Sequence, residues 1–196
     1  MKWFNAIDCT NTHATPYVAE RFDFLGRSPS QLTRGKPVAK WDSKAKLWAE
    51  NEDHDGIPDD ILQHCLVAVP VYSPRLRRAL EEGGISGIQY LDVRVLRPDG
   101  TSIPGYSIAN ITNLVPALDV GKSIVTRFDD PDPLCPKRSG QISSVLKPVL
   151  KSVSVTGIDI FRLAEFSLRY YVSQRFRDIC TRGKFKGYTF WEVPLS

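Results

Sequence analysis

Residues 73–93 read SPRLRRALEEGGISGIQYLDV, and residues 173–193 read SQRFRDICTRGKFKGYTFWEV. The two stretches align without a gap at an offset of 100, and six of their 21 positions are identical. Average residue usage would give roughly one or two identities over that length. Most other positions exchange similar side chains, as Tyr90 does for Phe190. The chain therefore carries a repeated supersecondary unit.

Each copy predicts a short helix, a glycine turn and a strand. Ser73 and Ser173 are suited to cap a helix, because a serine hydroxyl accepts a hydrogen bond from a free N–H of the first turn. Apolar residues then recur at i, i+3 and i+4, which gives one apolar stripe: Leu76, Ala79 and Leu80, then Phe176, Ile179 and Cys180. Gly83 and Gly183 stand where a left-handed residue would end the helix.

The strand that follows each glycine turn, IQYLDV or YTFWEV, is rich in β-branched and aromatic residues. Apolar side chains alternate onto both of its faces, which is typical of a central strand or one covered on both sides. Short strands mixed with short helices predict an α+β fold with a mixed or antiparallel sheet. We expect two parts: residues 1–58 with N-terminal strands and an acidic loop, and residues 59–196 with both repeated units. Within the first part, the segments around Trp41 and Trp48 are expected to form a hairpin.

Composition indicates an ordinary globular chain. At 196 residues it is long enough to bury a core. No apolar run approaches the roughly 18 residues of a membrane span, and the N-terminus lacks the apolar core of a signal peptide. We expect no membrane association and a cytoplasmic location. The four cysteines are widely spaced and form no CxxC motif, so reduced thiols are expected: Cys9, Cys65, Cys135 and Cys180.

Charge is unevenly distributed between the two halves. Residues 1–100 hold 13 Lys/Arg and 14 Asp/Glu, whereas residues 101–196 hold 13 and 8. The basic residues are spread over many elements, so nucleic acid is not the favoured partner. As the alternative function, a nucleic-acid-binding module would use this basic half and four aromatic residues: Tyr170, Tyr171, Phe185 and Tyr188.

The stretch ENEDHDGIPDD, residues 50–60, predicts an acidic loop. Its opening resembles a calcium loop, but position 12 falls on Leu62 instead of a glutamate, so no metal is expected. Clustered carboxylates can also enter a basic cleft of a partner, where complementary charge speeds association. The candidate partner-binding residues are Trp41, Trp48, Glu52, Asp53, Asp55, Asp59 and Asp60. Replacing Asp53, Asp55, Asp59 and Asp60 together by Asn is expected to weaken binding and leave the fold intact.

Two arginines begin each repeated helix, at 75 and 77 and again at 175 and 177. The helix dipole favours anions there, so we expect these arginines to pair with carboxylates, or to bind an anionic ligand.

A catalytic apparatus is not evident. The chain has no phosphate-binding GxxxxGK[ST] or GxGxxG motif, and no cofactor is predicted. Cys65 with His13 or His64 is the only nucleophile pair worth weighing, for a small hydrolase. Neighbouring residues in a strand point to opposite faces, which argues against His64 as the base for Cys65. We therefore do not expect an enzyme.

The segment VYSPRLRRALEEGGISGIQYLDV resembles the signature of a bacterial immunity-protein family encoded beside polymorphic toxins, once described as a domain of unknown function. GYSIANITNLVPALDVGKS and IFRLAE resemble further strands of that family, and the resemblance spans roughly residues 60–193. The matching positions that we single out as structural are Ser73, Arg75, Gly87, Asn110, Asp119, Ser173, Arg175 and Gly187.

The resemblance implies a protein without catalytic residues that binds one cognate toxin in the bacterial cytoplasm and blocks it. Four of the matching residues, Ser73, Gly87, Asn110 and Asp119, would then act as caps, turns and close backbone approaches. The expected partner is the toxin, and a homodimer is a second association that the sequence allows.

Overall fold

A computed structural model describes residues 2–8, 18–50, 59–64 and 68–196 of the chain. Over these ranges the fold is α+β, which confirms the predicted class. Two α-helices of nine residues each, α1 (Pro74–Glu82) and α2 (Gln174–Arg182), accompany three separate sheets. The short 3-10 helices are η1 (Pro29–Thr33), η2 (Pro136–Arg138) and η3 (Ser152–Val155).

One sheet has five strands in the order β10-β13-β14-β1-β15. Its neighbours are antiparallel except β10 and β13, which run parallel. The strands are β1 (Trp3–Asp8), β10 (Leu114–Val115), β13 (Ile160–Leu163), β14 (Tyr170–Ser173) and β15 (Tyr188–Val193).

A second sheet has eight strands in the order β6-β9-β5-β4-β2-β3-β7-β8. It is mixed, because β2 runs parallel to β4 and β3 runs parallel to β7. Its strands are β2 (Val18–Asp23), β3 (Lys46–Glu50), β4 (Ile61–His64), β5 (Val71–Tyr72), β6 (Ile88–Asp92), β7 (Arg94–Leu96), β8 (Ser102–Ile103) and β9 (Ser107–Ile111). The third sheet is the two-stranded ribbon of β11 (Ile124–Arg127) and β12 (Ile142–Lys147).

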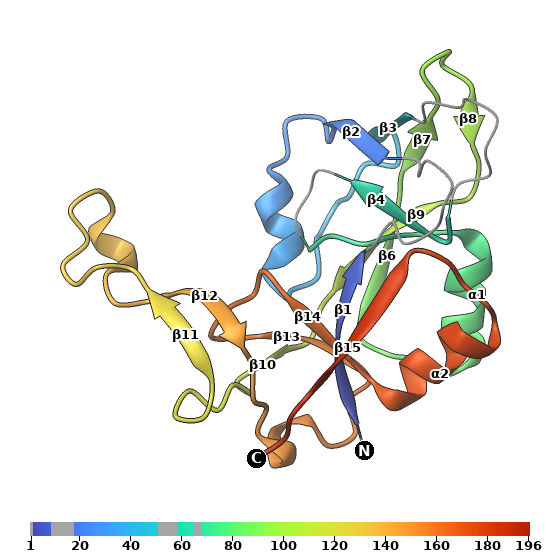
Figure 1. Cartoon of the computed structure of the whole chain (residues 1–196). Coiled ribbons are helices and arrows are strands. Elements are labelled where there is room, and N and C mark those ends of the chain that lie inside the picture. Colours follow the sequence, from blue (N-terminus) through green and yellow to red (C-terminus); the bar gives the residue numbers. More distant parts are fainter. Residues whose placement is uncertain (1, 9–17, 51–58, 65–67) are drawn as a thin grey trace.

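The two helices pack side by side against the larger sheets (Figure 1). One apolar cluster joins them, since it contains Leu76 and Leu80 of α1, Phe176 of α2, Phe4 of β1 and Ile111 of β9, all buried. A second cluster packs on the eight-stranded sheet and includes Leu32 of η1. A third, which includes Trp3 and Phe161, lies on the opposite face of the five-stranded sheet. The five-stranded sheet is therefore buried on both faces over much of its area.

The two repeated segments occupy equivalent positions in their sheets. In the first, β4 and β5 pair antiparallel, α1 follows β5, and β6 returns to the sheet with β9 inserted between β5 and β6. In the second, β13 and β14 pair antiparallel, α2 follows β14, and β15 returns with β1 inserted. The registers also correspond: Ser107 of β9 is opposite both Tyr72 and Asp92, and Phe4 of β1 is opposite both Val172 and Glu192.

Helix capping differs in one detail from the sequence prediction. The Ser73 and Ser173 side chains accept from the N–H groups of Leu76 and Phe176, as predicted. Gly83 and Gly183, however, keep right-handed φ angles of −72° and −75°, and the left-handed position is the next residue. That residue is Gly84 with φ +69° in the first copy and Lys184 with φ +50° in the second. Each helix thus runs one residue further before it reverses.

One prediction about strands was wrong, and another is confirmed for only one of its two strands. Residues 37–45, which include Trp41, form no strand. Strand β3 pairs with β2 and β7 instead of with this segment, so the expected hairpin is absent. Strands β6 and β15 lie at sheet edges, so of the two arrangements predicted for them, central or covered on both faces, only the second remains. Both faces of β6 are nevertheless covered, because Tyr90 packs on the cluster between the helices and Leu91 on the cluster near η1. On β15, Trp191 is 64% exposed, so that strand is covered on one face there.

Candidate functional site

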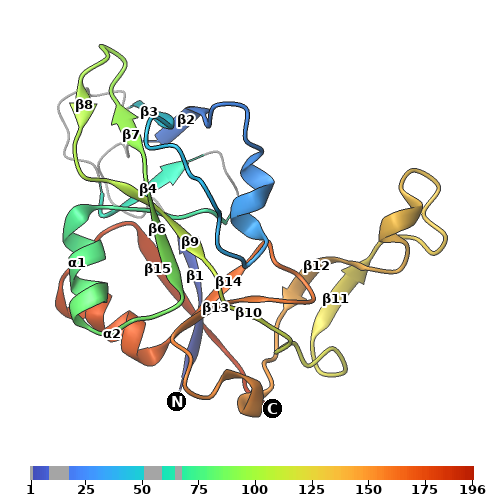
Figure 2. The ribbon, with the colours of Figure 1, turned by 180° about the vertical axis from the view of Figure 1, so that it is seen from behind.

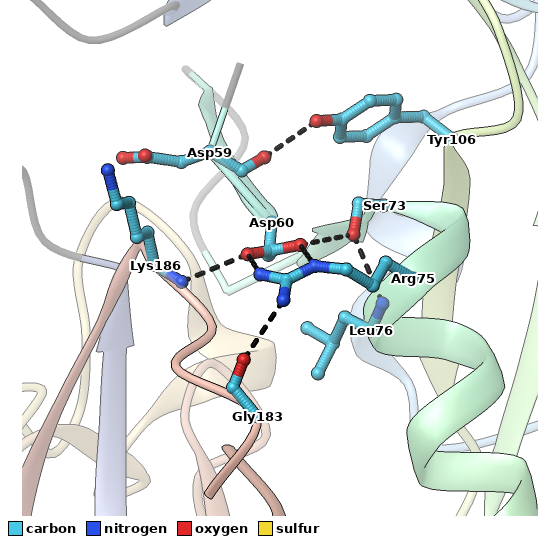
Figure 3. Close-up of polar contacts among 8 residues, drawn as sticks. All are labelled: Asp59, Asp60, Ser73, Arg75, Leu76, Tyr106, Gly183 and Lys186. Atoms are coloured by element: carbon cyan, nitrogen blue, oxygen red, sulfur yellow. Dashed lines mark hydrogen bonds and ion pairs between the residues drawn. The ribbon is translucent and has the colours of Figure 1, made fainter. Parts of the chain in front are cut away.

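Asp60 is the centre of a polar cluster that joins both repeated units (Figure 3). Its Oδ1 accepts from Ser73 Oγ at 2.7 Å and from Arg75 Nε at 3.2 Å. Its Oδ2 accepts from Arg75 Nη2 at 2.6 Å and from the backbone N–H of Lys186 at 3.1 Å. A carboxylate that is 8% exposed would be costly without such partners, and this fork geometry supplies them.

The backbone around Asp60 explains why these residues meet. Asp60 directly precedes β4, and its carbonyl accepts from the N–H of Ser73 at 2.7 Å as β5 passes into α1. The Ser73 hydroxyl both donates to Asp60 and accepts from the Leu76 N–H, so it is occupied as a cap. The cluster therefore fastens the start of α1 to the start of β4.

The second unit repeats this cluster. Ser173 Oγ donates to Asp159 Oδ1 at 2.6 Å, and the Ser173 N–H donates to the Asp159 carbonyl at 2.8 Å. Arg175 Nη1 lies 3.3 Å from Asp159 Oδ2. The expectation that carboxylates pair with the repeated arginines is confirmed for Arg75 and Arg175, and also for Arg77, which pairs with Glu81 at 3.0 Å. Arg177 instead lies over the Phe4 ring at 4.8 Å.

The two clusters also exchange hydrogen bonds. Arg75 Nη1 donates to the carbonyl of Gly183 at 3.0 Å, and Arg175 Nη2 donates to the carbonyl of Gly83. Each arginine at the start of one helix thus binds the end of the other helix, where the exposed carbonyls favour a cation. This reciprocal contact holds α1 and α2 together.

Asp59 lies beside this cluster. Its carbonyl accepts from the Tyr106 hydroxyl at 2.7 Å, and partial burial raises the pKa of its carboxyl, an effect that Lys186 opposes (Figure 3). Of the predicted acidic site, Asp59 is thus half-buried and Asp60 buried and internally bonded. Because Asp60 holds α1 in place, we now expect the fourfold replacement of Asp53, Asp55, Asp59 and Asp60 by Asn to lower the stability of the fold. Glu52, Asp53 and Asp55, like the calcium-like stretch that contains them, lie outside the described residues.

The two predicted tryptophans differ in their surroundings. Trp41 packs on the cluster near η1, 5.4 Å from the Phe24 ring, and its Nε1 donates to the Asp92 carbonyl at 2.7 Å. Trp48 is half-buried on β3, and the Arg21 guanidinium carbon lies 4.2 Å from its ring centroid. Their role in partner binding stays a prediction.

Asn110 and Asp119, two other residues singled out by the resemblance, make backbone contacts. Asn110 is fully buried on β9, and its Nδ2 donates to the Lys36 carbonyl at 3.0 Å. Asp119 caps the turn before β11, where its Oδ1 accepts from the Lys122 N–H at 3.2 Å. A hydrogen bond from Ser196 holds the pKa of Asp119 below its usual range.

Gly87 and Gly187 have positive φ angles of 88° and 102°. A Cβ at Gly87 would meet the Asn113 side chain at 2.1 Å, and one at Gly187 would meet the Ile61 carbonyl oxygen at 2.6 Å. At Gly187 both the backbone conformation and the space require glycine, whereas at Gly87 the clash is with the end of a side chain and the positive φ is the firmer constraint.

Arg162 is a buried cation that the sequence reading did not single out. It is 0% exposed on β13, and it donates to the carbonyls of Ser167 at 2.9 Å, Leu32 at 3.2 Å and Ala68 at 2.6 Å. Burial lowers the pKa of its guanidinium to about 10. Leu32 and Ala68 belong to the part of the chain around the eight-stranded sheet, so Arg162 joins the two large sheets.

The residues weighed for chemistry are partly outside the described ranges: Cys9, Cys65, His13 and His54. Cys180 is buried on α2, as predicted, and burial raises the pKa of its thiol to about 12. Among the residues that the structure describes, no group of three or more His, Cys, Asp or Glu side chains is arranged to hold a metal ion.

The prediction of aromatic rings available to nucleic acid was wrong for two of the four residues, Tyr170 and Tyr171. Tyr170 and Tyr171 are 3% and 0% exposed, and Phe185 and Tyr188 pack against the cluster between the helices. The Tyr188 hydroxyl is 2.5 Å from that of Tyr72. The rings of Tyr170 and Tyr171 therefore cannot stack on bases, because the core already surrounds them.

Several exposed apolar side chains were not predicted from the sequence, and two of them bear on partner binding. Trp191 on β15 is 64% exposed, and Leu134 in the loop between β11 and β12 is 86% exposed. Side chains alternate between the two faces of the strand YTFWEV, so Trp191 points to the face opposite that of Tyr188 and Phe190. This alternation could have predicted that Trp191 is exposed. Leu134 carried no comparable signal, because it lies in a proline-rich loop.

No helix in the described ranges is both long and apolar enough to cross a bilayer. A comparison with curated proteins finds no significant match. A family model does match, over residues 5–194, and it is that of the Immunity protein family (Imm11). The match begins well before residue 60, so it extends the earlier resemblance over most of the N-terminal part. With nearly the whole chain covered, this protein belongs to the Immunity protein family (Imm11).

Proposed function

We propose that this chain binds one cognate toxin of a polymorphic toxin system and neutralises it by covering its active site or functional surface. The observation that carries the proposal is the family match over residues 5–194. The fold supports it, because the polar clusters at Asp60 and Asp159 are internally bonded and hold a rigid framework. Rigid frameworks suit a binding protein, since less conformational freedom is lost when the complex forms.

The mechanism is occlusion in a stoichiometric complex, and no reaction is catalysed. We place this event in the cytoplasm of the producing bacterium, where the chain would meet the toxin before export. No membrane or nucleic acid takes part, and a homodimer is a further association to be measured alongside toxin binding.

The test uses the toxin domain encoded by the neighbouring reading frame. Co-expression of that domain with the wild-type chain should restore growth, and the purified pair should form a complex of constant stoichiometry. Titration of toxin activity should reach its minimum at one equivalent of the chain. Full inhibition at a small fraction of an equivalent would indicate turnover and would contradict occlusion.

The acidic loop is a proposed part of the interface, with Trp41 and Trp48 as neighbouring anchors. We would test Asp53→Asn with Asp55→Asn and leave Asp60 unchanged, because Asp60 binds Ser73 and Arg75 internally. Weaker toxin binding with unchanged thermal unfolding is expected. Unchanged affinity would remove the loop from the interface.

We also propose that the two helix–turn–strand units derive from one duplicated ancestor. The support is the matched strand order, the matched register and the two Ser–Arg–Asp clusters. The division expected at residue 58 is not part of this proposal, because the family model matches from residue 5 and β1 lies between β14 and β15. A chain of residues 59–196 should therefore fail to fold without β1, and independent folding of that chain would restore the division.

A further inference from the structure

The β11–β12 ribbon and its tip form an arm, residues 122–147, that projects from the rest of the molecule in both views (Figures 1 and 2). The arm is rooted in the core, because Val145 is fully buried in the cluster with Trp3 and pairs with Val125. Neither strand pairs with another sheet over the described residues. The arm is thus a firmly attached extension whose far end lies away from both large sheets.

The tip of the arm, residues 128–141, is braced by its own hydrogen bonds. Asp132 is 5% exposed, and its Oδ1 accepts from the N–H groups of Leu134 at 2.8 Å and Cys135 at 2.7 Å. Its Oδ2 accepts from Arg138 Nε at 2.9 Å, and the Arg138 guanidinium lies over the Phe128 ring at 4.3 Å. These bonds hold the pKa of Asp132 below its usual range. The tip therefore presents a set shape before any partner binds.

This braced tip exposes apolar surface. Leu134 is 86% exposed beside a recess of about 300 Å³, and Leu146 and Ile124 further along the arm are 57% and 49% exposed. Water contact with these side chains is unfavourable, and an apolar pocket of a partner would remove it. A preorganised loop that offers one apolar anchor is well suited to enter a cleft, because little ordering cost remains.

Charge along the arm identifies the class of partner. The strand portions, residues 122–128 and 141–147, contain three Lys/Arg and no Asp/Glu. The tip carries exposed carboxylates at Asp129 and Asp130 beside one exposed lysine, Lys137, so it offers a phosphate backbone no uniformly cationic surface. The complementary surface is a protein cleft with an apolar pocket at its base and carboxylates along its walls.

We propose that this arm enters a cleft of the toxin domain, with Leu134 as the anchor in an apolar pocket and the cationic strands along acidic walls. The inference rests on the proposed function, and it specifies which surface of the chain makes the contact.

The test measures binding of the purified toxin domain to three variants of the full chain. Leu134→Asp should weaken binding by about 30-fold or more, the size expected for a central anchor. Val153→Asp is the matched control, since Val153 is 85% exposed but lies on η3, and its affinity should stay within about twofold. Lys122→Glu with Lys147→Glu should slow association about tenfold and reduce its dependence on salt. Thermal unfolding of each variant shows that the body remains folded.

The outcomes separate this inference from the proposed function. If the wild-type chain neither binds nor neutralises the toxin domain, both fall. If the wild type binds and Leu134→Asp binds equally well, the arm is overturned and the function stands. A homodimer that Leu134→Asp dissociates without change in toxin affinity would assign the arm to self-association. Oligonucleotide binding that the double glutamate variant abolishes, with toxin affinity unchanged, would assign it to nucleic acid.

Discussion

Arg75 of α1 donates from Nη1 to the backbone carbonyl of Gly183, the capping residue of α2, at 3.0 Å. Arg175 of α2 makes the matching contact to the carbonyl of Gly83. Each contact joins residues about 100 positions apart, so the repeated sequence is also a repeated tertiary contact. The two helices are held at both ends by charges that the sequence places in their first turns.

Replacement of this arginine should lower the free energy of unfolding. Arg75→Met should cost about 1 kcal/mol, because the side chain is 57% exposed and water screens its ion pair with Asp60. Asp60→Ala should cost more, about 2–3 kcal/mol, since Ser73, Arg75 and the Lys186 N–H all lose their acceptor. Urea unfolding gives both values. Arg78→Met, an exposed position on the same helix, should change stability by less than about 0.5 kcal/mol. Equal losses for Arg75 and Arg78 would refute the role of the pair.

Removal of the buried Arg162 should be more severe. Arg162→Met removes the side-chain donor of three carbonyls, one buried and two partly buried, at about 1–3 kcal/mol for each that stays unsatisfied. We expect a loss above about 3 kcal/mol, and a partial loss for Arg162→Lys, which keeps the charge but not the fork of donors. Calorimetry measures both against Arg94→Met, an exposed control on β7. A Met variant as stable as the wild type would show that these hydrogen bonds contribute little.

Glycine at 187 should be required for packing as well as for conformation. Gly187→Ala should destabilise the chain by about 2 kcal/mol or more. The new Cβ would clash with the Ile61 carbonyl oxygen, and alanine would be strained at a φ of +102°. Gly100 also has a positive φ, of +84°, but nothing lies within 4 Å of an added Cβ. Gly100→Ala should therefore show the conformational cost alone, about 1 kcal/mol. Similar losses at the two sites in chemical unfolding would contradict the close approach of Ile61.

Lys184 offers the opposite change. This lysine ends α2 with a φ of +50°, where the first repeat has Gly84 at +69°. Lys184→Gly should stabilise the chain by up to about 1 kcal/mol, because glycine reaches this conformation without strain. Thermal unfolding measures the change, and Lys186→Gly, in a residue with no positive φ, serves as the control. A lower melting temperature for Lys184→Gly would show that contacts of the lysine outweigh the strain.

Stability should fall in alkaline solution. Burial raises the pKa of Cys180 from 9.0 to about 12 and that of Tyr171 from 10.0 to about 12, and it also raises those of Tyr90 and Tyr106. Between pH 9 and 12 the unfolded chain therefore holds fewer protons at these groups than the folded one, so the free energy of unfolding decreases as pH rises. Arg162 acts in the opposite direction above pH 10, because its pKa is lowered, but four acidic groups outweigh one base. Unfolding followed with tyrosinate absorbance from pH 8 to 12 tests this. A constant free energy over that range would show that these side chains titrate in the folded state.

Local features of this chain were predictable because they depend on neighbouring residues. The caps at Ser73 and Ser173, the apolar stripes of both helices and the strands after the glycine turns follow from hydrogen bonding and periodicity along a short segment. The need for carboxylates beside Arg75 and Arg175 also followed, from the direction of the helix dipole.

Which carboxylates these are depended on the tertiary structure. Asp60 had been grouped with the acidic loop because it is adjacent to Asp59 in sequence, and Asp159 had not been considered. Both face their arginines only because β4 pairs with β5 and β13 pairs with β14. Sheet order likewise depends on long-range pairing, which placed β6 and β15 at edges and left Trp191 exposed.

By itself, the sequence determined two helix–turn–strand segments, their caps and their amphipathic faces, because those properties are set within about 20 residues. Tertiary structure alone decided that the two segments bind each other through hydrogen bonds of Arg75 and Arg175. It also decided that Arg162 is buried between the sheets and that Leu134 is exposed on the arm. The reason is that burial and pairing depend on which distant segments meet, and no short-range pattern in the chain encodes those meetings.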